Sequence, residues 1–281
     1  MKQRLITAVF GFAVLIPVLV FSDTLVLPIA VALFSAIGVY EVVGCVGMKK
    51  KLEVLLPSML VAAAIPILSR YLTNYVGRIS YFLAVGSAIL FIYMYYLMSL
   101  TVVSKGTKNI LDIALIYLMT AYITTGFSSI VMLRDLPHGG FLILLVFVGA
   151  WVTDGAAYFV GRALGKHKLI PDVSPKKTIE GAIGGSVFCA LSFLIFGLVV
   201  GHFSSASVNV LQIIIAGLVI SIISQFGDLI ASLIKRHYGI KDYGKLFPGH
   251  GGVMDRFDSI IAISPFLLMI CSYPNIYAIF S

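Results

Sequence analysis

Residues 235–258 hold the side chains best suited to chemistry, and they read KRHYGIKDYGKLFPGHGGVMDRFD. Lysine, arginine, histidine and aspartate are interleaved there with glycine, which an ordinary solvated loop does not require. The stretch 248–252 (PGHGG) combines backbone freedom with peptide N–H groups, which suit an anion held beside a helix N-terminus. The pattern therefore predicts a binding site for a phosphate-bearing ligand.

Two aspartates close this segment and a third precedes it. Asp255 and Asp258 are three residues apart, so they share one face of a helix that begins near them. Asp228 lies in the preceding apolar run, and three close carboxylates repel one another unless a cation joins them. Hard oxygen ligands without cysteine or clustered histidine favour Mg²⁺ over Zn²⁺. We therefore predict a polyphosphate held by Mg²⁺, with an ordinary cytoplasmic loop and helix-capping acids as the alternative.

A second polar segment, residues 162–180, ends in DVSPKKTIE and is followed by Gly181. Ser174 and Pro175 can start a helix, which would place Lys176 and Lys177 in its first turn. Cations there oppose the helix dipole, and the misfit disappears if the lysines bind an anionic ligand. The alternative is that they only contribute to the positive charge of a cytoplasmic loop.

Asp154 and Asp228 lie inside apolar segments, where an ionisable group is costly and normally faces a cavity or a partner. The alternative is a hydrogen bond or buried pair that packs two helices. Polar residues that share a helix face with Asp228 are Ser221, Ser224 or Gln225, Ser232 and Lys235. Gly181, Gly184 and Gly185 have the spacing of a close helix–helix contact. Together these patterns predict a polar cleft that opens to the cytoplasm.

The elements that position these residues must be membrane helices. Of the 281 residues, 60% are hydrophobic and only 11% are charged, whereas soluble domains carry about 25% charged residues. This composition excludes a soluble enzyme, a disordered chain and a disulfide-stapled secreted domain. Cys45, Cys189 and Cys271 stand singly in apolar runs, so we expect them to act as small hydrophobes. The predicted fold is an all-α polytopic membrane protein.

About 20 mostly apolar residues are needed to span a bilayer, and the chain is expected to contain nine such runs. They are residues 4–22, 24–47, 54–70, 79–101, 110–132, 139–161, 180–202, 208–234 and 257–279. If the N-terminus is cytoplasmic, every lysine and arginine except Arg70, Arg78 and Arg134 falls on the cytoplasmic side, which predicts an N-in, C-out orientation. The net charge of +8 then reflects this bias, and no nucleic-acid partner is expected.

Residues 232–258 resemble, position by position, the signature of the phosphatidate cytidylyltransferases, also called CDP-diacylglycerol synthases. That signature is Ser-x-aliphatic-Lys-Arg, four residues, Lys-Asp, then a small residue, and finally Pro-x-His-Gly-Gly-x-x-Asp-Arg-x-Asp. Residues 4–8, 151–161 and 174–181 also resemble family segments. The second to fifth apolar runs resemble the family only in hydropathy.

The resemblance implies an all-helical membrane enzyme that converts CTP and phosphatidate to CDP-diacylglycerol and pyrophosphate. It implies Mg²⁺ as cofactor, with a monovalent cation such as K⁺ as a candidate second ion. It also implies a homodimer. We further expect the protein in the bacterial inner membrane, and the positive-charge distribution predicts an active site that faces the cytoplasm.

From this reaction and the residue patterns described above, we expect the following roles for individual residues. The expected metal ligands are Asp228, Asp255 and Asp258. The expected catalytic residues are Asp228, Lys235, His250, Asp255 and Arg256. The expected substrate-binding residues are Asp154, Ser174, Lys176, Lys177, Glu180, Ser232, Arg236, Lys241, Asp242, Lys245, Gly251 and Gly252. Most of the basic residues are expected to bind phosphates, whereas Asp154 and Glu180 are expected to orient lysines or read the cytosine amino group.

Residues 1–135 are expected to form a scaffold with lipid and dimer contacts, in which Glu41 and Asp112 lie near the cytoplasmic interface. Residues 136–281 are expected to carry catalysis, with cytoplasmic loops at 162–180 and 235–258. Two other functions stay open. A CTP-dependent polyprenol or phytol kinase would transfer the γ-phosphoryl group to a hydroxyl. A cation or phosphate transporter would use Asp154 and Asp228 as its path, although the chain shows no inverted repeat of the kind common in transporters.

Overall fold

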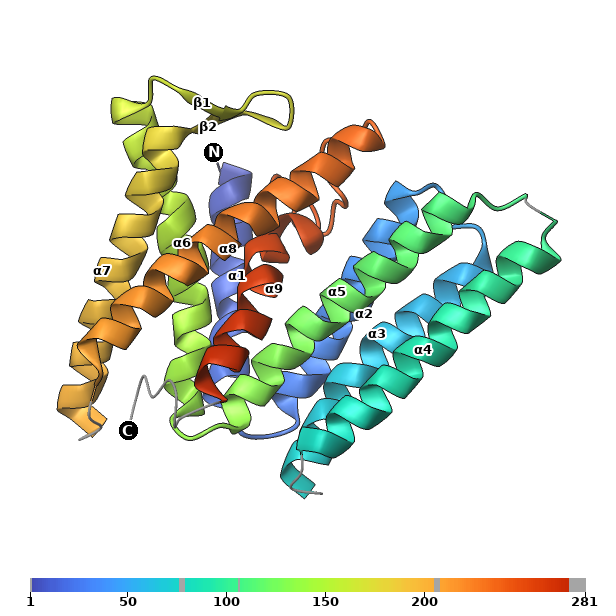
Figure 1. Ribbon diagram of the computed structural model, residues 1–281, viewed down its shortest axis with the longest axis horizontal. Helices are drawn as coiled ribbons and strands as arrows, with labels where there is room; N and C mark the ends of the chain where they lie inside the picture. The colour runs from blue at the N-terminus through green and yellow to red at the C-terminus, as the bar shows by residue number, and fades with distance from the viewer. Residues whose placement is uncertain (1, 76–78, 106, 205–207, 273–281) are drawn as a thin grey trace. The chain divides into compact units, whose positions relative to one another are not determined.

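The computed structural model describes residues 2–75, 79–105, 107–204 and 208–272, and its regular structure is almost entirely helical (Figure 1). The elements up to residue 135 are α1 (Lys2–Val20), α2 (Val26–Cys45), α3 (Leu52–Arg70), the π-helical turn η1 (Tyr71–Tyr75), α4 (Ile79–Val103) and α5 (Ile110–Asp135). The remaining elements are α6 (Gly139–Leu164), β1 (Lys168–Ile170), β2 (Ser174–Thr178), α7 (Ile179–Ser204), α8 (Val210–His237) and α9 (Met254–Cys271).

Seven of the helices in the described ranges are long and apolar enough to cross a membrane. They correspond to α2, α3, α4, α5, α6, α7 and α8, which confirms an all-α polytopic membrane protein. Helices α1 and α9 form but are not among the seven. Residues 273–279 of the ninth expected run, and Arg78, lie outside the described residues. The count of nine spans and the orientation therefore stay predictions.

The start of α7 differs from the prediction. Residues 174–178, which were expected to open a helix, form strand β2 and pair antiparallel with β1, so Lys176 and Lys177 lie in a hairpin (Figure 1). The helix begins one residue after Thr178, whose Oγ1 accepts a hydrogen bond from the Gly181 N–H at 3.1 Å. Thr178 thus satisfies one of the N–H groups that a helix start leaves unpaired. Lys176 and Lys177 therefore lie before the first turn of α7, and their charges do not oppose its dipole from within the helix.

Packing divides the chain into two compact units. The first unit comprises Met1–Asp135 and Tyr238–Arg256, and the second comprises Leu136–His237 and Phe257–Ser281. Most of the expected cytoplasmic loop 235–258 is thus grouped with the N-terminal helices.

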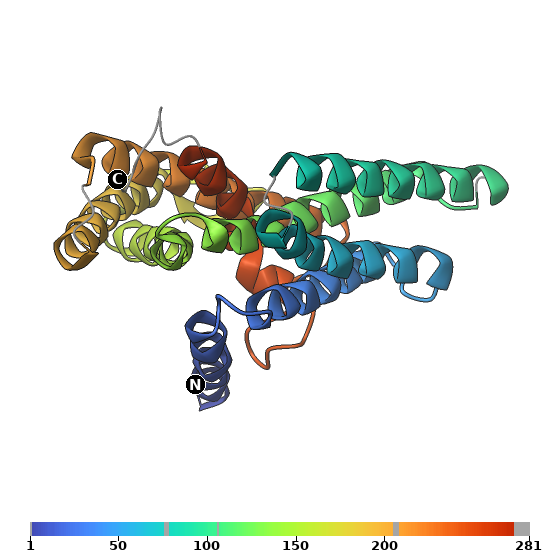
Figure 2. The same ribbon diagram turned by 90° about the horizontal axis from the view of Figure 1, so that it is seen from below.

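In the first unit, α2, α3 and α5 pack against one another, and α4 packs on α3 and α5 (Figure 1). Their contact is formed by fully buried aliphatic side chains such as Val39, Val54 and Ile116. A polar contact also joins α3 to α4, because the Ser58 Oγ and the Tyr93 hydroxyl lie 2.6 Å apart. Helix α1 points in a different direction from α2, to which it is joined by a short turn (Figure 2).

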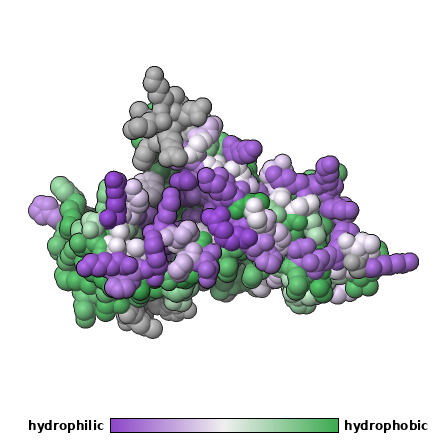
Figure 3. All heavy atoms as spheres, turned by 90° about the horizontal axis from the view of Figure 1, so that it is seen from above, coloured by the Kyte–Doolittle hydropathy of each residue, from purple (hydrophilic) through white to green (hydrophobic). Residues whose placement is uncertain are grey.

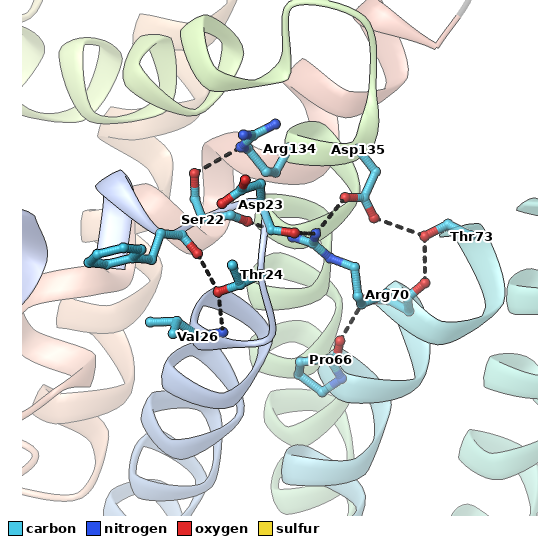
Figure 4. Close-up of polar contacts among 11 residues, drawn as sticks. Ser22, Asp23, Thr24, Val26, Pro66, Arg70, Thr73, Arg134 and Asp135 are labelled. Carbon is cyan, nitrogen blue, oxygen red and sulfur yellow. Dashed lines mark hydrogen bonds and ion pairs between the residues drawn. The ribbon is translucent and has the colours of Figure 1, made fainter. Parts of the chain in front are cut away.

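A buried polar network closes the end of the first unit at which α3 and α5 finish (Figure 4). The Arg70 guanidinium forms an ion pair with Asp135 at 3.2 Å and donates to the carbonyls of Ser22 at 2.8 Å and Asp23 at 3.0 Å. Arg134 Nε donates to the Ser22 Oγ at 2.8 Å. Because both members of the ion pair are buried, these bonds offset their desolvation and fix the turn between α1 and α2 against α3 and α5.

In the second unit, α6 and α7 approach closely along the glycines of α7. A Cβ on Gly181 would overlap the carbonyl oxygen of Ala157, and one on Gly185 would overlap that of Thr153. The predicted role of these glycines in a close helix–helix contact is therefore confirmed. Helix α8 then packs against α6 and α7. Figure 3 faces the end of this unit that carries the hairpin, and hydrophilic side chains gather there while hydrophobic ones lie along the flanks.

Candidate active site

The centre of the second unit's polar region is an ion pair between the hairpin and α8. The Lys177 Nζ lies 2.7 Å from the Asp228 Oδ2, and the two side chains are 24% and 30% exposed. The Ser232 Oγ lies 3.4 Å from the Asp228 Oδ1, one helical turn further along α8. Lys177, Asp228 and Ser232, three of the expected site residues, are thus brought together where ligands can reach them.

Other members of the polar row on α8 pack helices. The Gln225 side-chain amide donates to the Ala182 carbonyl at 3.2 Å and to the Ser186 Oγ at 3.3 Å, both on α7. The Ser221 Oγ donates to the Ser186 Oγ at 3.2 Å. These bonds satisfy polar groups within the contact between α7 and α8. Ser221 and Gln225 therefore form helix-packing hydrogen bonds, as the alternative interpretation proposed. Asp228 and Ser232, further along α8, remain available for chemistry.

Asp258 adds a buried carboxylate to the second unit. Its Oδ1 accepts a hydrogen bond from the Ser259 N–H at 2.8 Å, and the Ser259 Oγ donates to the Ser224 carbonyl on α8 at 3.3 Å. Burial is the main effect that disfavours the charged form of Asp258, the negative charges of Asp228 and Asp154 add to it, and the positive charge of Lys235 opposes it. Acids from α6, α8 and α9 thus influence one another, and lysines partly compensate their charge.

Glu180 has a different partner from the one expected. Its carboxylate lies 2.6 Å from the His167 Nδ1 and accepts the His167 backbone N–H at 3.2 Å. Glu180 therefore fastens the start of the hairpin to the first turn of α7 and is not paired with Lys176 or Lys177. Lys176 itself is exposed on β2, Ser174 is half-buried there, and Asp154 is exposed on α6.

In the first unit, the residues around the PGHGG stretch close on themselves. Phe247 and Gly251 form a bridge in which the Phe247 N–H donates to the Gly251 carbonyl at 2.9 Å. The backbone turns there through Gly249 and Gly251, with φ of 76° and 90°, a region that side chains other than glycine rarely adopt. The predicted need for backbone freedom at these glycines is therefore confirmed.

Three peptide N–H groups of this turn form hydrogen bonds within it. The N–H groups of His250 and Gly251 donate to the Phe247 carbonyl at 2.8 and 3.1 Å. The N–H of Gly252 donates to the Asp255 Oδ2 at 2.9 Å. These three N–H groups are thus used within the turn, and anion binding at the PGHGG stretch stays a prediction.

Asp255 holds this turn together. Its Oδ2 also accepts the Tyr243 N–H at 2.8 Å, so one carboxylate oxygen joins two distant points of the segment. Arg256 Nε donates to the His250 carbonyl at 2.7 Å. The exposed charged residues of the segment are Lys241, Asp242, Lys245 and Arg256, together with Arg236 at the end of α8.

Glu41 is a residue of this region that the sequence analysis placed only in the scaffold. It is 2% exposed on α2, and its two carboxylate oxygens each accept one backbone N–H, from Val253 and Met254, at 3.0 Å. The signal that could have revealed it is an acid within an apolar run, the same signal that drew attention to Asp154 and Asp228.

A second acid from the N-terminal helices holds the other end of the segment. The Tyr238 hydroxyl donates to the Asp112 Oδ1 on α5 at 2.7 Å. Burial and the neighbouring Asp112 carboxylate raise the pKa of the Tyr238 phenol above its usual value, so it keeps its proton and remains a donor.

The carboxylates suit a hard metal ion by type. Among the described residues, no three His, Cys, Asp or Glu side chains lie close enough to hold a metal by themselves. Mg²⁺ is commonly bound by one or two carboxylates together with substrate phosphates and water, so Asp228 and the crowded Asp258 remain a fitting donor set. Asp255 belongs to the first unit, where its carboxylate holds the turn.

Comparison with known proteins covers nearly the whole chain. The profile of the Cytidylyltransferase family matches residues 2–274. A phosphatidate cytidylyltransferase of Staphylococcus haemolyticus (strain JCSC1435) is 35% identical over 269 residues, covering 95% of this chain and 97% of that protein. Proteins of the same name from Staphylococcus aureus (strain COL) and Bacillus subtilis (strain 168) are 36% and 35% identical over 95% of this chain, and over 97% and 96% of their own lengths. The resemblance in the sequence motifs is thereby confirmed: the chain belongs to the cytidylyltransferase family.

Proposed function

We propose that this membrane enzyme transfers the CMP group of CTP to phosphatidate, giving CDP-diacylglycerol and pyrophosphate for phospholipid synthesis. The observation that carries the proposal is the match along 95% of the chain to relatives named phosphatidate cytidylyltransferase. The partly exposed Lys177, next to Asp228 and with Lys235 in the same unit, supports it, because these groups suit a polyanionic substrate.

The chemistry requires alignment and charge neutralisation more than a protein base. A phosphate oxygen of phosphatidate forms a bond to the α-phosphorus of CTP, and the bond to the bridging oxygen of the β-phosphate breaks, so pyrophosphate leaves. The lipid phosphate is already a nucleophile near neutral pH. Since both reactants are anions, positioned cations supply most of the rate enhancement. Lys177 would stabilise phosphate charge while Asp228 keeps its ammonium group in place.

The metal is part of the proposal. Asp228 and Asp258 are proposed as Mg²⁺ ligands, with Asp255 as a candidate third, because carboxylate oxygens are the ligands this ion prefers. A bound divalent ion would polarise phosphoryl oxygens and neutralise their charge. A monovalent ion such as K⁺ stays a prediction from the family resemblance.

The proposal also includes the orientation of the protein in the membrane and its oligomeric state. The bias of lysine and arginine supports nine spans with the N-terminus inside and the site facing the cytoplasm of the inner membrane. The family resemblance supports a homodimer. Reporter fusions after residues 23, 136 and 207 should report the outer side, and cross-linking in membranes should give a dimer band. Fusions reporting the inner side, or a band at monomer mass only, would contradict these points.

One assay tests the reaction. Purified protein in detergent receives phosphatidate and CTP labelled at the α-phosphorus, with Mg²⁺ present or chelated. Label should enter the lipid fraction only with Mg²⁺ present. Label that stays in CDP while a γ-label enters lipid would indicate the kinase instead, and turnover in the presence of a chelator would remove the metal assignment.

A further inference from the structure

Residues 238–256, called here the motif segment, are fastened at both ends by acids from helices that carry none of the expected site residues. At its start, the Tyr238 hydroxyl donates to Asp112 on α5 at 2.7 Å. At its end, Glu41 on α2 accepts the N–H groups of Val253 and Met254 at 3.0 Å each. Glu41 lies 212 positions before Val253, so this contact joins distant parts of the chain. The two anchors explain why the segment belongs to the first unit.

The contact at Glu41 suits a carboxylate, whose two oxygens each accept one backbone N–H. Val253 and Met254 are fully buried, so their N–H groups would lack water if Glu41 were removed. They are also at the beginning of α9, where helix N–H groups have no partner within the helix and a negative charge is favoured. A carboxylate satisfies both N–H groups at once, whereas an amide would turn its own NH₂ group towards one of them.

Two glycines of the motif segment leave space for this carboxylate. A Cβ built on Gly244 or on Gly252 would overlap the Glu41 carboxyl group. Backbone from the middle and from the end of the segment therefore meets at one side chain of α2. Gly244 has no expected substrate-binding or catalytic role. Its close approach to Glu41 explains why this position needs a glycine.

We propose that Glu41 is a positioning residue for the reaction, acting through the backbone of the motif segment. Asp255 directly follows Met254, whose N–H donates to Glu41. Arg256 comes next and donates from its Nε to the His250 carbonyl in the same segment. Glu41 thus sets where these three expected site residues lie, without touching substrate. This inference rests on the proposed nucleotidyl transfer.

The first test substitutes Glu41→Gln and compares it with Glu53→Gln, an exposed glutamate of α3 in the same unit that pairs with Lys108. Glu41→Gln should lower kcat about 10–100-fold, the effect of displacing reacting groups by about an ångström, while KM for phosphatidate stays within about threefold. Glu53→Gln should leave both constants unchanged. A kcat equal to wild type in a folded Glu41→Gln protein would overturn the proposal.

A double-mutant cycle tests whether the effect passes through the segment. Gly244→Ala should lower kcat on its own, because its methyl group displaces the Glu41 carboxylate. In a Glu41→Ala background the space is open, so adding Gly244→Ala should cause little further loss. Gly140→Ala, whose Cβ meets nothing within 4 Å, serves as the control. Independent, multiplying losses for Glu41→Ala and Gly244→Ala would overturn the proposed route.

Amide hydrogen exchange provides a measurement that does not depend on the reaction. In Glu41→Gln, peptides that cover residues 250–256 should exchange faster than in wild type, while peptides of α6 remain unchanged. If wild type places no label in lipid, the proposed function fails, and exchange still reports whether Glu41 anchors the segment. Faster exchange with unchanged kcat, or lower kcat with unchanged exchange, would each overturn the positioning role.

Discussion

The two polar regions of the molecule use their charged side chains in different ways. Around Asp228, side chains face side chains: Lys177 and Ser232 contact a carboxylate that is 30% exposed. In the motif segment, backbone N–H groups donate to the carboxylates of Asp255 and of Glu41 on α2, and these bonds shape the chain. An acid that contacts only side chains can exchange a lysine for a ligand, whereas displacing a carboxylate oxygen that holds backbone N–H groups disturbs the local fold. We therefore expect the first region to control chemistry directly and the second to control geometry.

The largest effect should follow Asp228→Asn. Losing this charge removes the partner of Lys177 and a proposed metal ligand, so kcat should fall about 10³-fold. Because the Asp228 side chain is partly exposed and its contacts are with the Lys177 and Ser232 side chains, thermal unfolding should shift little. Labelled-CTP incorporation and a melting curve in detergent would check both points, with Asp172→Asn on the hairpin as control. A large loss of stability would break the contrast between the regions.

Asp255→Asn should be the next most damaging change, with kcat lower by about 10²-fold. Here the loss should be accompanied by faster proteolysis within residues 238–256, because Asp255 joins the Tyr243 and Gly252 N–H groups. Limited trypsin digestion at Lys241 and Lys245, followed by mass spectrometry, measures this. A digestion pattern identical to that of Asp228→Asn would show that both aspartates act in the same way.

Gly251→Ala should have an intermediate effect. A Cβ there would lie 2.7 Å from the Asp255 Oδ2 and would sit on a backbone with φ of 90°. The strain costs about 1–3 kcal/mol, and we expect about a tenfold lower kcat from the displaced carboxylate. Gly239→Ala is the matched control, since Gly239 also has positive φ but nothing within 4 Å of its Cβ position. Equal losses in both variants would mean that backbone strain alone matters.

The smallest effect should follow His167→Ala. The His167 side chain is 74% exposed, so its contact with Glu180 should contribute little in water. Between pH 6 and 8, the activity of the variant should differ from that of wild type by less than about twofold, measured as initial rates of lipid labelling. A tenfold loss would mean that the hairpin is held mainly by this pair, and would place Glu180 closer to the chemistry than its contacts indicate.

Features that depend on local periodicity could be predicted from the sequence. Apolar runs identified the membrane helices, and the spacing of Gly181, Gly184 and Gly185 identified the contact between α6 and α7. Family motifs identified the segments that contain Lys177 and Asp255, and an acid within an apolar run identified Asp228.

Features that depend on distant pairing could not be predicted in this way. Residues 174–178 form a strand because residues 168–170 pair with them, and nothing in SPKKT alone indicates that partner. Glu41 finds its N–H donors more than 200 positions away, and the contact requires a particular packing of α2. The use of the Gly252 N–H within the turn likewise depends on the Asp255 carboxylate folding back, which composition cannot reveal.

The hairpin of β1 and β2 must lie where water can reach its unpaired backbone groups. Two strands alone leave a row of N–H and C=O groups on each outer edge, and lipid tails offer no partner for such groups. An open-edged ribbon is therefore intolerable among acyl chains and must sit in the hydrated headgroup zone or beyond it. Because Lys177 belongs to β2, this requirement of the backbone places it at the aqueous boundary, independently of where the positive charges lie.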